Sequence, residues 1–145
     1  MCQSNSDIIY ALDDLGRYRI FRSDDRGQNW YIYSDQEQGV RHGRLDRLPT
    51  FAIDTIGCDK VYGLVDYDLA VYNGTAWRKT GVLDLAGYSS TSELGNYVRS
   101  VAIDPNNPDV IYAGMISSGI SDVWRSLDGG YNWEDISYNR PRVGI

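Results

Sequence analysis

The sequence repeats itself with a period near 50 residues. Ser100–Gly114 aligns with Thr50–Leu64 without a gap, and in both segments an apolar run leads through a turn into a second apolar run. A third copy is shorter, since Asp7–Leu12 matches Asp109–Gly114 alone. Repeats of this length are the signature of folds that consist of copies of one supersecondary unit. The period therefore predicts three copies of one such unit.

Each unit divides into four short strands, which we name A to D in chain order. Strand B is expected at residues 8–12, 61–65 and 110–115, and no helical periodicity is long enough to compete. Four strands and a period near 50 are typical of one blade of a β-propeller. We therefore predict an all-β fold of three four-stranded antiparallel blades. The expected bounds are about 1–33, about 48–80 and about 98–138 for the three blades, and about 140–145 for strand A of a further or partner blade.

The turn between strands C and D carries one motif twice: Ser, any residue, Asp, any residue, Gly, any two residues and Trp. Ser and Asp side chains accept hydrogen bonds from turn N–H groups, and glycine allows the positive φ that such a turn needs. We expect the Trp to anchor the hairpin between neighbouring blades. In the middle unit Asn73-Gly74 stands instead, which predicts a two-residue hairpin turn. The motif residues are Ser23, Asp25, Gly27 and Trp30 in the first copy and Ser126, Asp128, Gly130 and Trp133 in the second.

The motif resembles the Asp-box, or bacterial neuraminidase repeat, of sialidases, xyloglucanases, sortilin-like receptors and photosystem assembly factors. Ala102–Gly114 also resembles the blade sequence of xyloglucanases. The resemblance implies a propeller whose motif hairpins lie on the outer part of each blade, away from the active face. It also favours an extracellular or periplasmic location. The likeness to sialidases is less complete, because Tyr18–Phe21 lacks the proline of their Arg-Ile-Pro motif.

The two ends of the sequence match in repeat phase. Met1 aligns with Ile103, where strand A ends, and Val143–Ile145 matches Val101–Ile103. Three blades do not close a ring, since propellers have about four to eight, and an open arc exposes apolar faces and strand edges. One hypothesis is a homodimer, a six-bladed ring in which each C-terminal strand completes the partner's first blade. The other hypothesis is that the chain is a piece of a longer propeller.

The charge and the residue types argue against several function classes. The formal net charge of −6 disfavours nonspecific nucleic-acid binding, and no apolar run approaches the roughly 20 residues of a membrane span. One His and two distant Cys make no zinc site, and no Gly-rich phosphate loop opens a helix, so we expect no metal and no cofactor. Two alternatives stay open. Asp104–Asp109 is either a rigid turn or a calcium site, and Cys2 is either an ordinary residue or a lipidation site.

The candidate site lies on the face where the B–C and D–A connections meet, because propellers usually carry their function there. Acids, arginines and tyrosines on one face suit the recognition of a sugar or a peptide, although solvated polar loops are the simpler explanation. The candidates for ligand binding are Arg41, His42, Arg44, Tyr67 and Tyr88. Glycosidase chemistry needs two carboxyl groups at a defined separation. The candidates for that pair are Asp13, Asp14, Asp66 and Asp68.

Two functions follow from these residues. The first is a noncatalytic propeller that binds or scaffolds a glycan or protein partner. The alternative is a glycoside hydrolase, xyloglucanase-like or sialidase-like, or a fragment of one. A pair of carboxyl groups roughly 5 to 9.5 Å apart over a cleft would favour the hydrolase.

Overall fold

The computed structural model describes residues 1–12, 19–34, 51–65, 68–87, 97–117 and 120–139. These residues form three antiparallel sheets. The first contains β1 (Ile9–Leu12), β2 (Ile20–Ser23) and β3 (Tyr31–Ser34). The second contains β4 (Ala52–Ile53), β5 (Val61–Val65), β6 (Asp68–Tyr72) and β7 (Trp77–Lys79). The third contains β8 (Tyr97–Asp104), β9 (Asn107–Ser117), β10 (Ile120–Ser126) and β11 (Glu134–Asp135).

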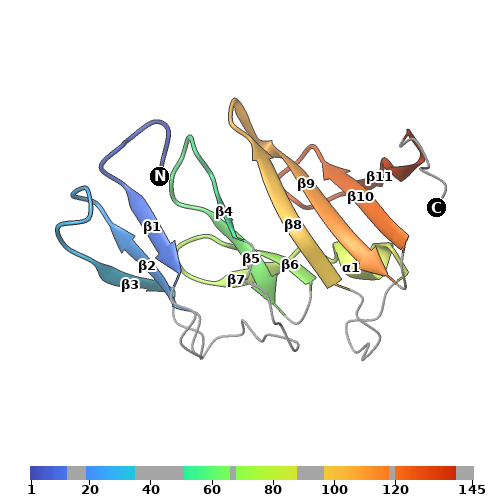
Figure 1. The fold of residues 1–145 in the computed structure, drawn as a ribbon, viewed down its shortest axis with the longest axis horizontal. Helices are drawn as coiled ribbons and strands as arrows, with labels where there is room; N and C mark the ends of the chain where they lie inside the picture. The colour runs from blue at the N-terminus through green and yellow to red at the C-terminus, as the bar shows by residue number, and fades with distance from the viewer. Residues whose placement is uncertain (13–18, 35–50, 66–67, 88–96, 118–119, 140–145) are drawn as a thin grey trace.

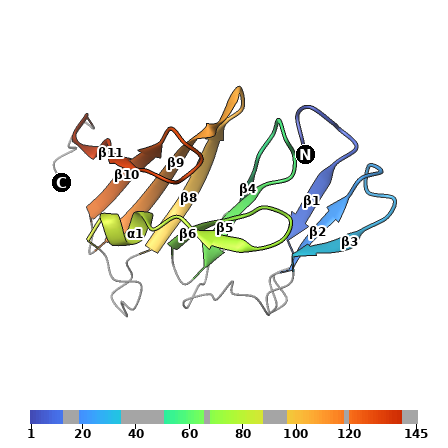
Figure 2. The ribbon, with the colours of Figure 1, turned by 180° about the vertical axis from the view of Figure 1, so that it is seen from behind.

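The three sheets stand side by side in chain order (Figures 1 and 2). Within each sheet, strands that follow one another along the chain are hydrogen-bonded neighbours. The predicted all-β fold with consecutive antiparallel strands is confirmed. The second and third sheets have four strands, whereas the first has three in the part of the chain that the structure describes.

Two local features differ from the sequence prediction. Strand B of the third unit begins at Asn107, three residues earlier than expected, because Asp104 pairs with Asn107 and the turn shortens to two residues. The Asp104 carboxylate tightens that turn by accepting the N–H of Asn106 at 2.8 Å. The helical turn α1 (Val82–Leu85) follows β7, where a loop was expected. It forms because Val82 and Leu83 are both fully buried against the sheets.

In the described part of the chain, the core lies between the sheets and forms two separate clusters. The cluster that joins the second and third sheets is the larger. It contains Tyr62, Leu64, Leu69, Val71, Val82, Leu83, Val98, Ile111, Ala113 and Met115. The cluster that joins the first and second sheets has three buried residues, Tyr10, Ile20 and Val61. Each sheet is therefore stabilised by burying apolar side chains on its neighbour rather than within itself.

Strand pairing puts the three units in one register. A tyrosine occupies the same place in each strand B, namely Tyr10, Tyr62 and Tyr112. The paired residues in strand C are Arg22, Val71 and Arg125. The residues paired with those in strand D are Tyr31, Arg78 and Glu134. These rows define equivalent positions in the three sheets.

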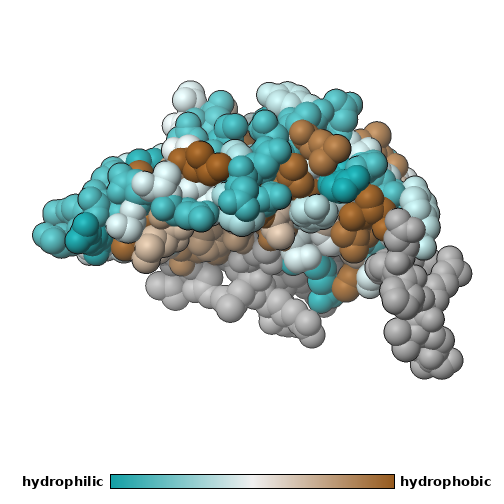
Figure 3. All heavy atoms as spheres, turned by 90° about the horizontal axis from the view of Figure 1, so that it is seen from above, coloured by the Kyte–Doolittle hydropathy of each residue, from teal (hydrophilic) through white to brown (hydrophobic). Residues whose placement is uncertain are grey.

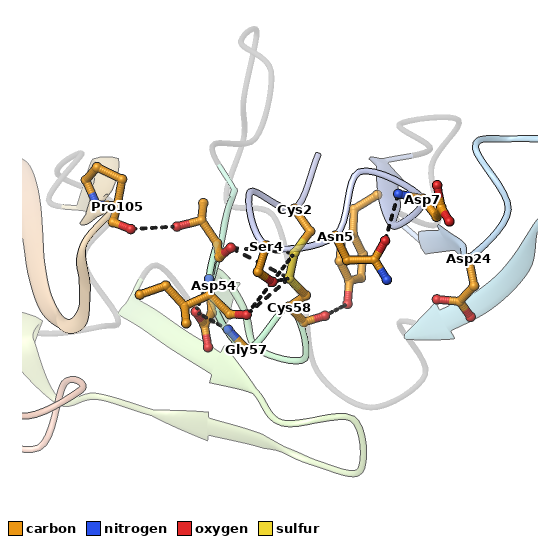
Figure 4. Close-up of a disulfide and its surroundings, with 12 residues drawn as sticks. Cys2, Ser4, Asn5, Asp7, Asp24, Asp54, Gly57, Cys58 and Pro105 are labelled. Atoms are coloured by element: carbon orange, nitrogen blue, oxygen red, sulfur yellow. Dashed lines mark hydrogen bonds between the residues drawn. A yellow bond between two sulfur atoms is a disulfide. The ribbon is translucent and has the colours of Figure 1, made fainter.

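A disulfide joins the N-terminal segment to the second sheet. It links Cys2 to Cys58 in the A–B turn, with Cα atoms 5.6 Å apart, a separation that suits such a bond. Ser4 adds a hydrogen bond from its hydroxyl to the carbonyl of Ile56 at 2.6 Å (Figure 4). The sequence did not predict this pairing, since two cysteines with a sequence separation of 56 carry no local signal.

Candidate functional site

The motif hairpin of the first sheet is held by its own side chains. The Ser23 hydroxyl accepts the N–H of Gly27 at 2.8 Å and donates to the Asp25 carboxylate at 2.8 Å. Asp25 also accepts the backbone N–H of Asn29 at 2.8 Å. The Trp30 indole N–H donates to the carbonyl of Gly27 at 3.0 Å. The polar groups of this hairpin therefore satisfy one another.

The hairpin of the third sheet repeats the hydrogen bonds of the serine and the aspartate. Ser126 accepts the N–H of Gly130 at 2.8 Å, and Asp128 accepts the backbone N–H of Asn132 at 2.8 Å. The backbone and side-chain N–H groups of Asn132 lower the pKa of Asp128 to about 2. A carboxylate with this many intramolecular donors has few positions left for a ligand, so the network indicates a structural role.

The tryptophans of the second and third sheets both make contacts between neighbouring sheets. The Trp77 indole N–H donates to the Ser34 hydroxyl at 2.9 Å. Trp133 packs against the cluster between the second and third sheets, and Arg78 donates to the carbonyls of Gly129 and Gly130 at 3.1 and 3.2 Å. Trp30 belongs to the first sheet, which follows no other sheet in the described residues, and it is 43% exposed.

Asp68 is the candidate carboxylate that the structure places most clearly. It begins β6, is 4% exposed, and accepts the backbone N–H groups of Leu69, Gly81 and Leu83 at 2.9, 2.8 and 3.2 Å. Burial raises the pKa of Asp68, while these N–H groups, led by that of Leu83, act in the opposite direction. The side chain thus connects the start of β6 to the first turn of α1.

A surface pocket of about 220 Å³ lies beside the outer hairpin of the third sheet. It is lined by Arg125, Leu127, Asp128, Asn132, Trp133 and Glu134. Arg125 and Glu134 form an ion pair across it, with nitrogen and oxygen 2.5 Å apart. Sequence reasoning missed this pocket, because its lining combines motif residues with Arg125 and Glu134, which flank the motif.

Comparison with known proteins identifies the fold. No protein-family model matches the sequence, and no curated protein matches it. Among solved structures, the chain is similar to the GH74 enzyme of Niastella koreensis, with a TM-score of 0.69 and 22% identity. The aligned region covers 94% of this chain and 22% of that enzyme. The three sheets are β-propeller blades.

The propeller fold places the ends of the described strands relative to the candidate loops. Strand B ends at Leu12 in the first blade and at Val65 in the second, and strand C of the second blade starts at Asp68. The B–C connections therefore leave the blades at the edge where Asp68 lies. The other candidates lie outside the described residues: Asp13, Asp14, Arg41, His42, Arg44, Asp66, Tyr67 and Tyr88.

Two further searches concern metals and membranes. Among the residues that the structure describes, no three or more His, Cys, Asp or Glu side chains gather closely enough to hold a metal ion. No helix in the same part of the chain is long and apolar enough to cross a membrane. Seen from above, polar side chains cover much of the surface, and apolar side chains form separate areas between them (Figure 3).

Proposed function

We propose that this chain is a noncatalytic β-propeller module that binds or scaffolds a glycan or protein partner. The observation that carries the proposal is the position of Asp68. Its carboxylate is buried and is used by three backbone N–H groups. A catalytic carboxyl must instead reach a substrate and exchange a proton with it. This residue supports the fold at the edge where the candidate loops leave the blades.

Binding is assigned to side chains in those loops. Arg41, His42 and Arg44 supply cationic donors, and Tyr67 and Tyr88 supply aromatic faces with hydroxyl groups. Guanidinium and tyrosine groups suit both the hydroxyl groups of a sugar and the carbonyls of a peptide. The disulfide between Cys2 and Cys58 supports an oxidising compartment, extracellular or periplasmic, as the place of action.

The alternative is a glycoside hydrolase, xyloglucanase-like or sialidase-like, or a fragment of one. The observation that favours it is the likeness of fold to a GH74 enzyme, of which the aligned region is about a fifth. In this alternative Asp13 or Asp14 would work with Asp66, since a hydrolase needs two carboxyl groups on opposite sides of the bond that breaks.

One experiment separates the two functions. The full chain is titrated with a panel of oligosaccharides by calorimetry, and the same mixtures are assayed for released reducing sugar. The proposal expects binding without release, and Arg44→Ala and Tyr88→Ala should each weaken that binding. Sugar release that Asp66→Asn abolishes would establish the hydrolase instead. Asp68→Asn is unsuitable as an active-site variant, because the loss of a structural carboxylate also lowers stability.

We also propose that two chains assemble into a six-bladed ring. Support comes from the open side of the first blade, where two large apolar side chains are exposed. Trp30 and Ile32 are 43% and 47% exposed. Large apolar side chains at such exposure on one face are typical of a contact surface. Residues 140–145, which lie outside the described part of the chain, would complete the partner's first blade. Their deletion should convert a dimer into a monomer in sedimentation analysis.

A further inference from the structure

Blade 1 holds blade 2 through a tyrosine and an arginine. The Tyr10 hydroxyl donates to the carbonyl of Cys58 at 2.6 Å, and the Arg22 guanidinium donates to the same carbonyl at 3.2 Å. Arg22 also donates to the Tyr10 hydroxyl at 2.9 Å. Together the two side chains form a socket for one carbonyl in the A–B turn of the following blade.

Blade 3 carries the same socket on its far side. Tyr112 and Arg125 occupy the positions of Tyr10 and Arg22 in the strand register. Arg125 is held in place by Glu134, with which it forms contacts of 2.5 and 2.6 Å. Tyr10 and Tyr62 are each covered by the following blade and are only 7% and 1% exposed. In the part of the chain that the structure describes, no following blade covers Tyr112 and Arg125.

A second contact between blades involves the outer hairpin. Arg78 of blade 2 donates to the carbonyls of Gly129 and Gly130 in the hairpin of blade 3. The position of Arg78 is taken by Glu134 in blade 3. The position of Gly129 in the motif is taken by Arg26 in blade 1. A contact between the open faces of blades 3 and 1 would bring Glu134 to the hairpin that carries Arg26, whose guanidinium pairs with Asp7 in its own chain.

The apolar contact matches as well. In blade 1, Ser34 accepts the indole N–H of Trp77 from the next blade. The equivalent residues are Thr80 in blade 2 and Ile136 in blade 3, which donate their backbone N–H groups to the equivalent strand C carbonyls of Leu69 and Val123. The Ile136 side chain offers no acceptor. The Trp30 indole N–H needs none, because it already donates to the carbonyl of Gly27. Ile136 on the open face of blade 3 can therefore pack against Trp30 of blade 1 without leaving the indole N–H unpaired.

We propose that the open face of blade 3 binds the open face of blade 1 in a second copy of this chain. Tyr112 and Arg125 donate hydrogen bonds to the carbonyl of the partner's Ser6, the residue of blade 1 that is equivalent to Cys58 of blade 2. Glu134 forms an ion pair with the partner's Arg26, and Ile136 packs against the partner's Trp30. Two such contacts, related by a two-fold axis, close the ring. The assignment rests on the ring in the proposed function and names the side chains that form it.

Charge reversal tests the pairing. Sedimentation equilibrium of the full chain should give a mass twice that of the 16.4 kDa chain. Glu134→Arg places two cations together at both contacts, and Arg26→Glu places two anions together, so each should raise the dimer dissociation constant by about tenfold or more. Asp84→Arg is the matched control, because it makes the same charge change on the exposed surface of α1 and should leave the constant unchanged.

Mixing the two variants provides the decisive measurement. In a one-to-one mixture, the reversed charge at position 134 of one copy meets the reversed charge at position 26 of the other, so the two charges are again opposite. The second contact of that heterodimer keeps its native Glu134 and Arg26. The heterodimer should therefore bind more tightly than either variant alone. Recovery should be partial, because the substitutions also remove the ion pairs that Glu134 forms with Arg125 and Arg26 with Asp7 in their own chains.

Two outcomes would overturn the proposed interface, and only one of them also overturns the six-bladed ring. A native chain that sediments as a monomer overturns both the ring and this interface. A native dimer that neither variant weakens, or a mixture that binds no more tightly than either variant alone, overturns this interface and leaves the ring standing.

Discussion

Asp68 shows how one residue can look catalytic in the sequence and structural in three dimensions. An aspartate near a loop of a propeller is a natural candidate for glycosidase chemistry. Its carboxylate instead gathers the N–H groups at the start of β6 and at the first turn of α1. Burial of a charge is tolerated where hydrogen bonds replace water, and three donors supply that replacement here.

Asp68→Ala should lower the free energy of unfolding by about 2 to 4 kcal/mol. It leaves the buried N–H groups of Leu69 and Leu83, and the partly buried one of Gly81, without this acceptor. Urea denaturation of the variant and the native chain measures the difference. Asp84→Ala is the control, since that residue is exposed on the same helical turn, and it should change stability by less than about 0.5 kcal/mol. Equal effects of the two substitutions would contradict the structural role of Asp68.

Asp128 predicts a dependence of stability on pH. Its pKa in the folded chain is lowered from 3.8 to about 2 by the N–H groups of Asn132. A carboxyl with a lowered folded pKa contributes stability above its unfolded pKa, and this contribution is lost as the pH falls toward the folded value. Urea midpoints measured from pH 5 to pH 2 should therefore fall less steeply in Asp128→Asn than in the native chain. A variant with an unchanged slope would show that the carboxylate is not the titrating group.

At the scale of elements, the C–D hairpin is stabilised from inside by Ser and Asp and from outside by its tryptophan. Trp133→Ala should cost about 3 to 5 kcal/mol, the usual cost of removing a large packed aromatic side chain. Thermal or urea unfolding measures this loss, and a value under about 1 kcal/mol would contradict the anchoring role. Trp30→Ala is the matched comparison. Its side chain is 43% exposed, so in the dilute, monomeric chain it should cost less.

The sequence predicts those elements whose cause is local. The hairpins follow from motif residues within a few positions of one another, and strand B follows from an apolar alternation that recurs with the period. Contacts between distant residues leave no such pattern. Asp68 bonds to Leu83, fifteen residues on, and α1 forms because Val82 and Leu83 are buried in the cluster between the second and third blades. The disulfide depends on two turns that become neighbours only when the blades stack.

At the scale of the whole chain, the two contacts between blades differ in kind. Among the residues that the structure describes, blades 2 and 3 share ten buried residues, whereas blades 1 and 2 share three. Specific polar contacts and a covalent bond compensate at the weaker contact. Tyr10 and Arg22 bind the carbonyl of Cys58, Tyr33 donates to that of Asp59, and Cys2 is joined to Cys58. Burial raises the pKa of Tyr10, which keeps its hydroxyl protonated as a donor.

This difference predicts where the chain opens first. A disulfide that closes a loop with a sequence separation of 56 is worth about 4 kcal/mol in the chain-entropy description. Reduction should therefore weaken the attachment of blade 1 most, because little apolar burial remains to hold it. Hydrogen exchange in a reducing buffer should show β1, β2 and β3 losing protection while β8, β9 and β10 keep it. The double variant Cys2→Ser, Cys58→Ser should exchange in the same way with or without the reductant. Equal loss of protection in all three blades would mean that the blades unfold as one unit, with the smaller core no weaker than the larger.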